Sequence, residues 1–591
     1  MPAVGPTIEL HVLRAYALVA DGERGAIIGP HGDIVWMCVP RWDSPAAFSR
    51  LLGGAGHYVV TPADPWHVWG GYYEPGSLIW HSRWIGDSMT ECREALAMPA
   101  DPHRAVLLRR IEAVDGPARV TVALDVRAGY GRNGMTDLTR DGDCWTGSSG
   151  GVRFRWSGAA KARHTADALL MTIDLVAGEH HDLVLELSDR ALTDAPVRPE
   201  VAWMGTEEAW SRVVPDCSEL IAVTDARHAY AVLHGLTSAS GAMVAAATMA
   251  LSENRGENRN YDYRYAWIRD QCYTGLAIAA HGPHLLLEGA VKFITERILA
   301  DGPGLMPAYT VAGEPIPDQK ALPLRGFPGG SAIAGNLVRG QFQLDPFGES
   351  LTLLAAAARL DMLGKDDWRA VATAVDAIEK RWREPDAGIW ELDNRHWAQS
   401  RLSCVGGLRL IAAAAAEGPI GGHRRRDAAR WSSLADAILA DLGDCVHPTG
   451  RWQRAPDDER VDAALLLPVI RGSLPLSDPR MQGTAAAVRE ELSADGFVYR
   501  FRHDVRPLHK AEGAFLLCGF WMAHVEHAHG NAAAAARLFE RNRAACGSPT
   551  LYTEEYDVHQ RQLRGNLPQA FVHAAMLECA VTLSRDVEPG S

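Results

Sequence analysis

Four segments of the chain combine aromatic rings, acidic residues and arginines outside any regular apolar pattern. They are Asn258–Asp270, Leu322–Glu349, Gly388–Gln399 and Tyr552–Gln569. Sugar rings have apolar faces that stack on Trp or Tyr, and their hydroxyl groups need paired donors and acceptors, so this composition is typical of a sugar-binding site. The alternative is that the rings are ordinary core, as we expect for most of the 18 tryptophans.

Three of these segments place carboxyl groups where they could take part in acid–base chemistry. Arg269 and Asp270 stand in the opening of an amphipathic helix, where Asp270 could also simply stabilise the helix start. Glu391 follows Trp390 after a glycine turn, and an apolar ring disfavours the charged form of a carboxyl, which suits a general acid. In Thr553–Asp557 one carboxylate could hold a water, although adjacent acids are more often a solvated surface pair.

Two kinds of scaffold must position these residues. Residues 1–215 contain short alternating runs separated by Gly, Pro, Asp and Asn, which favours a β-sandwich over an α+β fold. Residues 216–591 contain about a dozen stretches with the apolar spacing of helices. No repeat of fixed period is visible, so we expect a closed (α/α)6 barrel rather than a solenoid, with irregular loops at one end forming a pocket.

Composition and charge exclude several classes of protein. The 591 residues are 47% hydrophobic and carry a formal net charge of −14, so we expect a globular protein without a nucleic-acid partner. No apolar stretch reaches the roughly 20 residues that span a bilayer, and Met1–Ala20 has no secretory pattern, so we expect a cytoplasmic protein without a membrane partner. The ten cysteines form no C-x-x-C pair and the histidines lack ligand spacing, so we expect neither metal nor cofactor.

Several motifs, in their order along the chain, resemble those of glycoside hydrolase family 15, which contains glucoamylase-like and bacterial trehalase-like enzymes. Each motif is weak alone, but the ordered set is specific and covers nearly the full length. The motifs are Gly32–Pro45, Asn260–Asp270, Gly340–Asp345, Gly388–Glu391, Glu512–Cys518, Glu554–Asp557 and Asn566–Phe571.

The resemblance implies an N-terminal β-sandwich and a C-terminal (α/α)6 barrel, in agreement with the patterns above. It also implies inverting, metal-independent cleavage of an α-glucosidic bond, with Glu391 as general acid and Glu554 as general base. Inversion requires the two carboxyl groups to lie about 6.5–9.5 Å apart. A barrel can bring their separate loops to opposite sides of a pit that admits one chain end. The residues expected to bind substrate are Trp267, Arg269, Asp270, Trp390 and Glu555.

Two segments depart from the family pattern. Met249 and Ala250 replace hydroxyl residues, and Ile333 and Ala334 stand where an arginine usually precedes Gly335–Asn336. Loss of a guanidinium removes a bidentate clamp on hydroxyl groups. We therefore expect these four residues to line a less polar pocket that accepts an unusual sugar or aglycone.

The sequence favours an exo-acting hydrolase that releases β-glucose from a small soluble α-glucoside, either trehalose or a malto- or isomalto-oligosaccharide. Two other hypotheses remain open: a specialised glycosidase or glycosyl-transferring enzyme of a biosynthetic pathway, and a sugar-binding protein on a retired hydrolase scaffold. The presence of both Glu391 and Glu554 argues against a retired site. The oligomeric state is not predicted.

Overall fold

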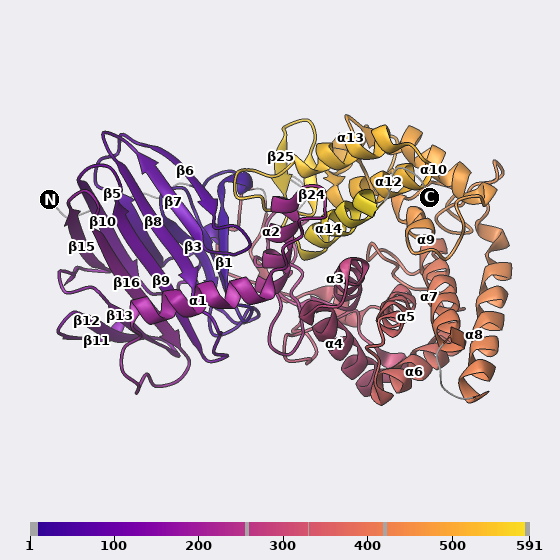
Figure 1. The fold of residues 1–591 in the computed structure, drawn as a ribbon, viewed down its shortest axis with the longest axis horizontal. Coiled ribbons are helices and arrows are strands. Elements are labelled where there is room, and N and C mark those ends of the chain that lie inside the picture. Colours follow the sequence, from indigo (N-terminus) through magenta and orange to yellow (C-terminus); the bar gives the residue numbers. More distant parts are fainter. Residues whose placement is uncertain (1–9, 254–258, 329, 418–421, 586–591) are drawn as a thin grey trace.

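The computed structural model describes residues 10–253, 259–328, 330–417 and 422–585. Strands make up its N-terminal part and helices most of its C-terminal part (Figure 1). Two of the four sequence segments include positions outside the described residues, Asn258 and Gly329. Residues 1–9, on which the expectation about a secretory leader partly rests, also lie outside them.

Two antiparallel sheets face each other across a shared apolar core in the N-terminal part, which confirms the predicted β-sandwich. The first sheet consists, in spatial order, of β1 (Ala17–Ala20), β2 (Gly25–Ile28), β3 (Asp33–Cys38), β5 (His57–Pro62), β10 (Ala118–Asp125), β15 (Leu169–Leu175) and β14 (Arg163–His164), with β4 (Ala46–Phe48) beside β3. The second consists of β11 (Thr136–Asp141), β12 (Cys144–Ser149), β13 (Val152–Ser157), β16 (His180–Ser188), β9 (Arg104–Ala113), β8 (Met89–Leu96), β7 (Trp80–Ile85) and β6 (Val68–Tyr73).

The helices form two concentric rings, which confirms the predicted (α/α)6 barrel (Figure 1). Each inner helix packs against the next, and the last packs against the first, so the ring closes. The inner helices are α3 (Ile268–His281), α5 (Asp345–Arg359), α7 (Ala398–Glu417), α9 (Leu467–Ile470), α12 (Leu516–Ala528) and α14 (Ala570–Arg585). The outer helices are α2 (Val223–Gly235), α4 (Leu285–Asp301), α6 (Lys365–Arg381), α8 (Gly422–Asp441), α10 (Pro479–Glu491) and α13 (Ala532–Arg543).

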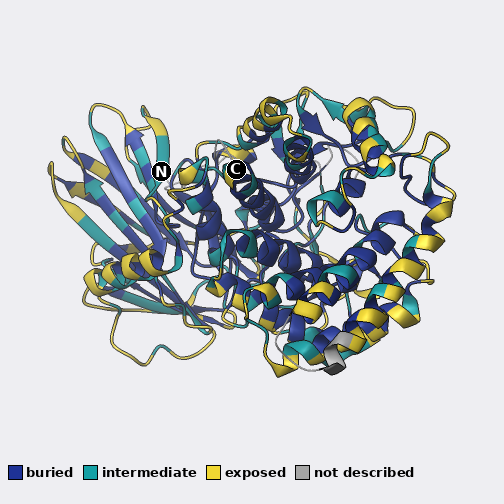
Figure 2. Cartoon of the chain, turned by 45° about the vertical axis from the view of Figure 1, so that its right-hand side comes forward, coloured by how far each residue is buried: buried dark blue, intermediate teal, exposed yellow. Residues whose placement is uncertain are grey.

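The inner and outer helices differ in burial because their side chains differ in polarity. Inner helices such as α12 and α14 are apolar on nearly all sides and buried, whereas exposed residues gather on the outer helices (Figure 2). Helices α5 and α7 approach closely at Gly348 and Gly407, where a Cβ on either glycine would overlap the backbone of the other helix. Small residues at this crossing therefore set the packing distance between the two helices.

Two inner helices begin later than their apolar spacing predicts. The spacing predicts a helix over Tyr263–Ala280, but α3 begins at Ile268, because the preceding residues are extended and end in the short strand β17 (Ala266–Trp267). Helix α12 likewise starts only after the short strand β23 (Ala514–Phe515). The extended residues present their side chains at one end of the barrel, which a helix would not do.

The strands end at Ser188, and α1 (Pro199–Val213) packs against β9 and β16 of the sandwich. Arg93 of β8 lies with its guanidinium 4.3 Å from the ring centre of Trp203 on this helix. We therefore propose to count α1 with the N-terminal domain and to keep the boundary near residue 215.

One buried guanidinium joins the sandwich to the barrel. Arg264 donates to both oxygens of Asp262, at 2.9 and 2.7 Å. It also donates to the Ser44 carbonyl at 2.8 Å and to the Tyr130 hydroxyl at 3.2 Å, both in the sandwich. Arg264 is only 1% exposed. The sandwich thereby helps to fix the extended segment that contains Tyr263.

We expect Arg264→Met to lower the free energy of unfolding by about 3–5 kcal/mol, because Asp262 would keep a buried charge without its partner. Thermal and urea unfolding would measure this. Arg119→Met is the matched control, since Arg119 lies 3.5 Å from Asp174 in an exposed ion pair and should change stability by less than about 1 kcal/mol. Equal losses in both variants would contradict the role given to Arg264.

Candidate active site

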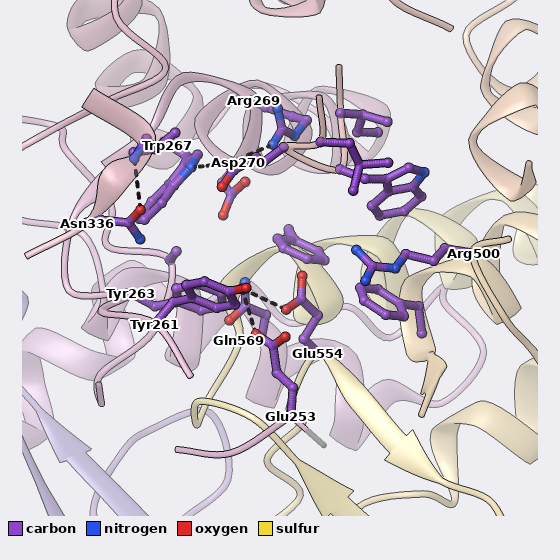
Figure 3. Close-up of a pocket in the computed structure, with 18 of the residues that line it drawn as sticks. Glu253, Tyr261, Tyr263, Trp267, Arg269, Asp270, Asn336, Arg500, Glu554 and Gln569 are labelled. Carbon is purple, nitrogen blue, oxygen red and sulfur yellow. Dashed lines mark hydrogen bonds and ion pairs between the residues drawn. The ribbon is translucent and has the colours of Figure 1, made fainter. Parts of the chain in front are cut away.

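A cavity of about 450 Å³ lies at the end of the barrel where the inner helices begin (Figure 3). Aromatic rings, carboxyl groups and guanidinium groups all reach it. The rings are those of Tyr261, Tyr263, Trp267, Trp390, Phe515 and Phe571; the carboxyl groups those of Glu253, Asp270, Glu391 and Glu554; the guanidinium groups those of Arg259, Arg269 and Arg500. Of the site residues predicted from the sequence, all but Glu555 line this cavity.

Glu391 is held on one wall by two neighbouring side chains. Trp267 Nε1 donates to Glu391 Oε1 at 2.8 Å, and Arg269 Nη2 lies 3.5 Å from the same oxygen. Arg269 is itself fixed by Gln343 and Asp345, at 2.8 and 3.2 Å. The backbone of Glu391 is left-handed, with φ of 55°, a conformation that costs about 1–2 kcal/mol for a residue with a Cβ. The surrounding contacts therefore determine the direction of this side chain.

Asp270 stands in the first turn of α3, with its carboxyl group pointing into the open space (Figure 3). Burial raises its pKa to about 7, with the charge of Glu391 adding to this effect and Arg269 opposing it. The helix-start alternative considered from the sequence accounts for its position, but the cavity also receives its oxygens. Asp270 can therefore bind a hydroxyl group, and its pKa depends on the charge of Glu391.

Glu554 lies across the cavity from Trp267 and Asp270, next to Tyr263 and Glu253 (Figure 3). The Tyr263 hydroxyl lies 2.9 Å from Glu554 Oε2 and 3.0 Å from Glu253 Oε1. Burial raises the pKa of Glu554 to about 8; the charge of Glu253 adds to this and Arg500 opposes it. Glu391 and Glu554 are thus brought to one cavity, each beside an aromatic hydrogen-bond donor.

Glu512 contacts three basic side chains on the side of the cavity that contains Glu554. It accepts hydrogen bonds from Arg500 Nε at 2.8 Å and His503 Nε2 at 2.6 Å, and Arg259 Nη1 lies 3.4 Å away. Burial acts to raise the pKa of Glu512, but Arg500 and His503 outweigh it and lower the pKa to about 2. The guanidinium of Arg500 also lies 4.5 Å from the ring centre of Phe515. Glu512 therefore acts as the ionised anchor of the cationic side of the cavity.

Glu555 does not line the cavity, although the sequence suggests it as a substrate-binding residue. Its Oε2 accepts a hydrogen bond from the Gly513 amide at 2.8 Å, and burial raises its pKa well above the usual range. Successive side chains in extended backbone point to opposite sides, so Glu554 and Glu555 cannot both face the same space. Its placement is that of a buried structural carboxyl group, and we no longer assign it to substrate binding.

The four residues at the departures from the family pattern do not line the cavity, contrary to the expectation. Ile333 and Ala334 form the short strand β20, which pairs with β19 (Lys320–Ala321), and neither lines the cavity. Met249 and Ala250 are fully buried and do not line the cavity either. The guanidinium groups of Arg259 and Arg500 reach the cavity instead, so its capacity to bind hydroxyl groups is not lost.

Several cavity residues were missed from the sequence. Glu253, Arg259 and Arg500 line the cavity but were not proposed as site residues. Glu512, which contacts Arg500 and Arg259 without lining the cavity, was seen only within a motif. The sequence does show Glu253 as an acid a few residues before the Asn260–Asp270 motif. It stands at the end of a segment that was discussed only where its residues differ from the family pattern. Arg500 gave no signal, because it comes from an irregular stretch between elements.

A second cavity of about 520 Å³ adjoins the first on the side of Glu391. Four residues line both cavities: Gln341, Glu391, Leu392 and His503. Glu554 lines only the first. Glu391 therefore stands at the junction of two spaces, either of which could hold a sugar ring.

Two further properties concern only the described part of the chain. It contains no group of three or more His, Cys, Asp or Glu side chains arranged to hold a metal ion. None of its helices is both long and apolar enough to cross a membrane.

A β-sandwich joined to an (α/α)6 barrel, with acids and aromatic rings around one cavity, is the architecture of a glycosidase. The chain belongs to glycosyl hydrolases family 15, whose model matches residues 226–581. A model described as "Trehalase-like, N-terminal" matches residues 9–194. The chain is therefore a glycoside hydrolase.

Relatives resemble the chain along nearly its whole length. A trehalase of Mycobacterium tuberculosis is 30% identical, covering 97% of this chain and 90% of the relative. Trehalase 1 of Sulfolobus acidocaldarius is 25% identical, covering 96% and 98%. An isomaltose glucohydrolase of Kribbella flavida is 30% identical, covering 47% and 70%. A crystal structure of a bacterial glucoamylase complexed with acarbose shares the fold, with a TM-score of 0.67, 13% identity and coverage of 99% and 96%.

We expect Glu512→Gln and Glu555→Gln to change stability with opposite dependence on pH. Because the folded pKa of Glu512 is about 2, its charge stabilises the fold above the unfolded pKa of about 4.3, and this contribution fades as pH falls below that value. Glu512→Gln should thus cost about 3 kcal/mol at pH 7 and progressively less in acid.

Glu555 has a raised folded pKa, so the wild type loses stability as pH rises above about 4.3, where the unfolded chain releases a proton that the fold retains. Stability relative to wild type should therefore rise with pH for Glu555→Gln. Thermal unfolding between pH 4 and 8 would measure both slopes. Parallel slopes would show that the two acids do not differ in ionisation.

Proposed function

We propose that the protein is an inverting, exo-acting hydrolase that releases β-glucose from a small α-glucoside, with trehalose as the first candidate. The observation that supports this best is the position of Glu391 at the junction of the two cavities, with Glu554 in the first cavity only. A glycosyl unit in the first cavity and a leaving group in the second would place the bond between them beside Glu391.

In this proposal Glu391 is the general acid. It protonates the oxygen of the leaving group, and Trp267 and Arg269 hold the carboxyl oxygen that does not carry the proton. Glu554 is the general base and takes a proton from a water on the opposite face of the sugar. Water then forms its bond to the anomeric carbon as the bond to the leaving group breaks, which inverts the configuration.

The remaining cavity residues would bind the glucosyl unit. The Asp270 carboxyl group and the guanidinium of Arg500 offer acceptors and donors for hydroxyl groups. The rings of Tyr261, Trp267 and Trp390 offer apolar surface to the sugar faces. Relatives named trehalases match over nearly the whole chain, whereas the relative named for isomaltose matches about half of it. This difference favours trehalose over isomaltose.

The panel that tests the proposal contains trehalose, maltose, isomaltose, kojibiose, nigerose and p-nitrophenyl α-glucoside. We expect release of β-glucose from trehalose, observed by NMR before mutarotation, and a loss of at least about 100-fold in Glu391→Gln, within the range that a general acid contributes. Initial release of α-glucose would exclude inversion. A panel without any product, combined with sugar binding, would favour the retired scaffold or a specialised substrate.

Tyr263→Phe and Tyr261→Phe form a matched pair that tests the base. Their rings stack with centres 6.3 Å apart, but the hydrogen bond to Glu554 comes from Tyr263. We expect Tyr263→Phe to lower kcat by about 10–100-fold, because the ionised base loses its donor, and Tyr261→Phe to change kcat by less than about threefold. Similar losses of kcat in both variants would contradict this assignment.

A further inference from the structure

We propose that Glu253 is a positioning residue for the base: it carries a proton, donates it in a hydrogen bond to Tyr263, and so lets Tyr263 donate to an ionised Glu554. This inference rests on the proposed role of Glu554 as general base. It gives Glu253 a function although the residue lies outside the pair of acids that inversion requires.

The geometry around the Tyr263 hydroxyl requires such a proton. The hydroxyl oxygen lies within hydrogen-bond distance of Glu253 Oε1 and Glu554 Oε2, at 3.0 and 2.9 Å. A phenol has one proton and can donate only one hydrogen bond. If both carboxyl groups were ionised, one of the two contacts would join two acceptors in a buried place. One additional proton, held by either acid, satisfies both contacts.

The charges on this side of the cavity favour the same additional proton. Four buried acids, Glu253, Glu512, Glu554 and Glu555, share this region with two guanidinium groups, Arg259 and Arg500, and with the imidazole of His503, which pairs with Glu512. Burial raises the pKa of Glu555 well above the usual range. One proton between Glu253 and Glu554 leaves Glu512 and one further carboxylate, and Arg500 attracts both of them. Each remaining buried charge then has a cationic neighbour, as burial requires.

Glu253 is the better holder of this proton. It is 3% exposed, against 8% for Glu554. Its nearest guanidinium, Arg259, lies 3.7 Å from Glu253 but 3.4 Å from the ionised Glu512. The charged and titratable groups around the two acids are Arg259, Tyr261, Tyr263, Asp270, Glu391, Arg500, His503, Glu512, Cys518 and Glu555.

The proposal resolves a conflict in the reaction. Burial and a charged Glu253 together raise the pKa of Glu554 to about 8, so with both groups in this state Glu554 would be protonated at neutral pH and could not accept a proton from water. With the shared proton on Glu253, Glu554 is ionised, and its other oxygen is free to take the proton of the attacking water. Glu253 keeps its proton throughout, so it acts through Tyr263 and not on the substrate.

Two substitutions of Glu253 test the proposal, because it predicts that the amide of equal length is tolerated and the shorter acid is not. In Glu253→Gln the amide nitrogen can donate to Tyr263 and the amide oxygen can face Arg259, so we expect kcat within about threefold of wild type and an unchanged acid limb of the pH profile. Glu253→Asp keeps the acid but is one methylene shorter and does not reach Tyr263. The proton then stays on Glu554, and kcat at pH 7 should fall by at least about tenfold and recover as pH rises.

An ionised Glu253 paired with Arg259 predicts the opposite result. Glu253→Asp would then be the more active variant, and Glu253→Gln would move the acid limb to lower pH by about one unit or more, because a charge beside Glu554 is lost. Either outcome would overturn the proposal. Thermal unfolding of both variants shows whether a lost activity reflects a lost fold.

Infrared difference spectroscopy provides a readout without activity. The spectrum of wild type minus Glu253→Gln at pH 7 should show the loss of a protonated carboxyl band, and loss of carboxylate bands instead would overturn the proposal. This result is separable from the proposed function. If Glu391→Gln retained full activity, the assignment of the acid would fail while the protonation of Glu253 could still be read directly.

Discussion

A carboxyl group removed from water must either meet a cation or keep its proton, and this constraint determines the arrangement of one whole wall of the cavity. Glu512 meets Arg500 and His503 and is ionised. Glu555, in the same region, accepts a hydrogen bond from a backbone amide, and burial raises its pKa well above the usual range. Glu554 lies between these extremes, and its state depends on Tyr263 and Glu253. Neighbouring acids thus differ in charge because their partners differ.

The site also depends on the barrel, which brings segments from distant parts of the chain to one end. Helices α3 and α12 each begin after a short strand, so extended residues present their side chains where the inner helices start. Asp270 and Asp345 stand in first turns, where the helix dipole favours negative charge.

Much of this arrangement could be predicted from the sequence. The alternating runs and the helical spacing sufficed for the sandwich and the barrel, and ordered motifs led to Glu391, Glu554 and Asp270. Strand β6, with its central pair of glycines, and the polar strand β11 gave no clear alternation. Glu555 was misplaced because proximity in sequence is not proximity in an extended chain. Glu253 and Arg500 depend on contacts between distant segments, which no local pattern encodes.

The Arg264 contacts have a consequence for the history of such chains. Ser44 and Tyr130, which lie in the sandwich, hold the guanidinium that fixes the segment containing Tyr263. A recombination event that attached a different N-terminal half to this barrel would replace the two oxygens that Arg264 needs, and the sugar site would be disturbed although none of its own codons had changed. A change in the turn around Ser44 would thus act on chemistry that takes place in the other half of the chain.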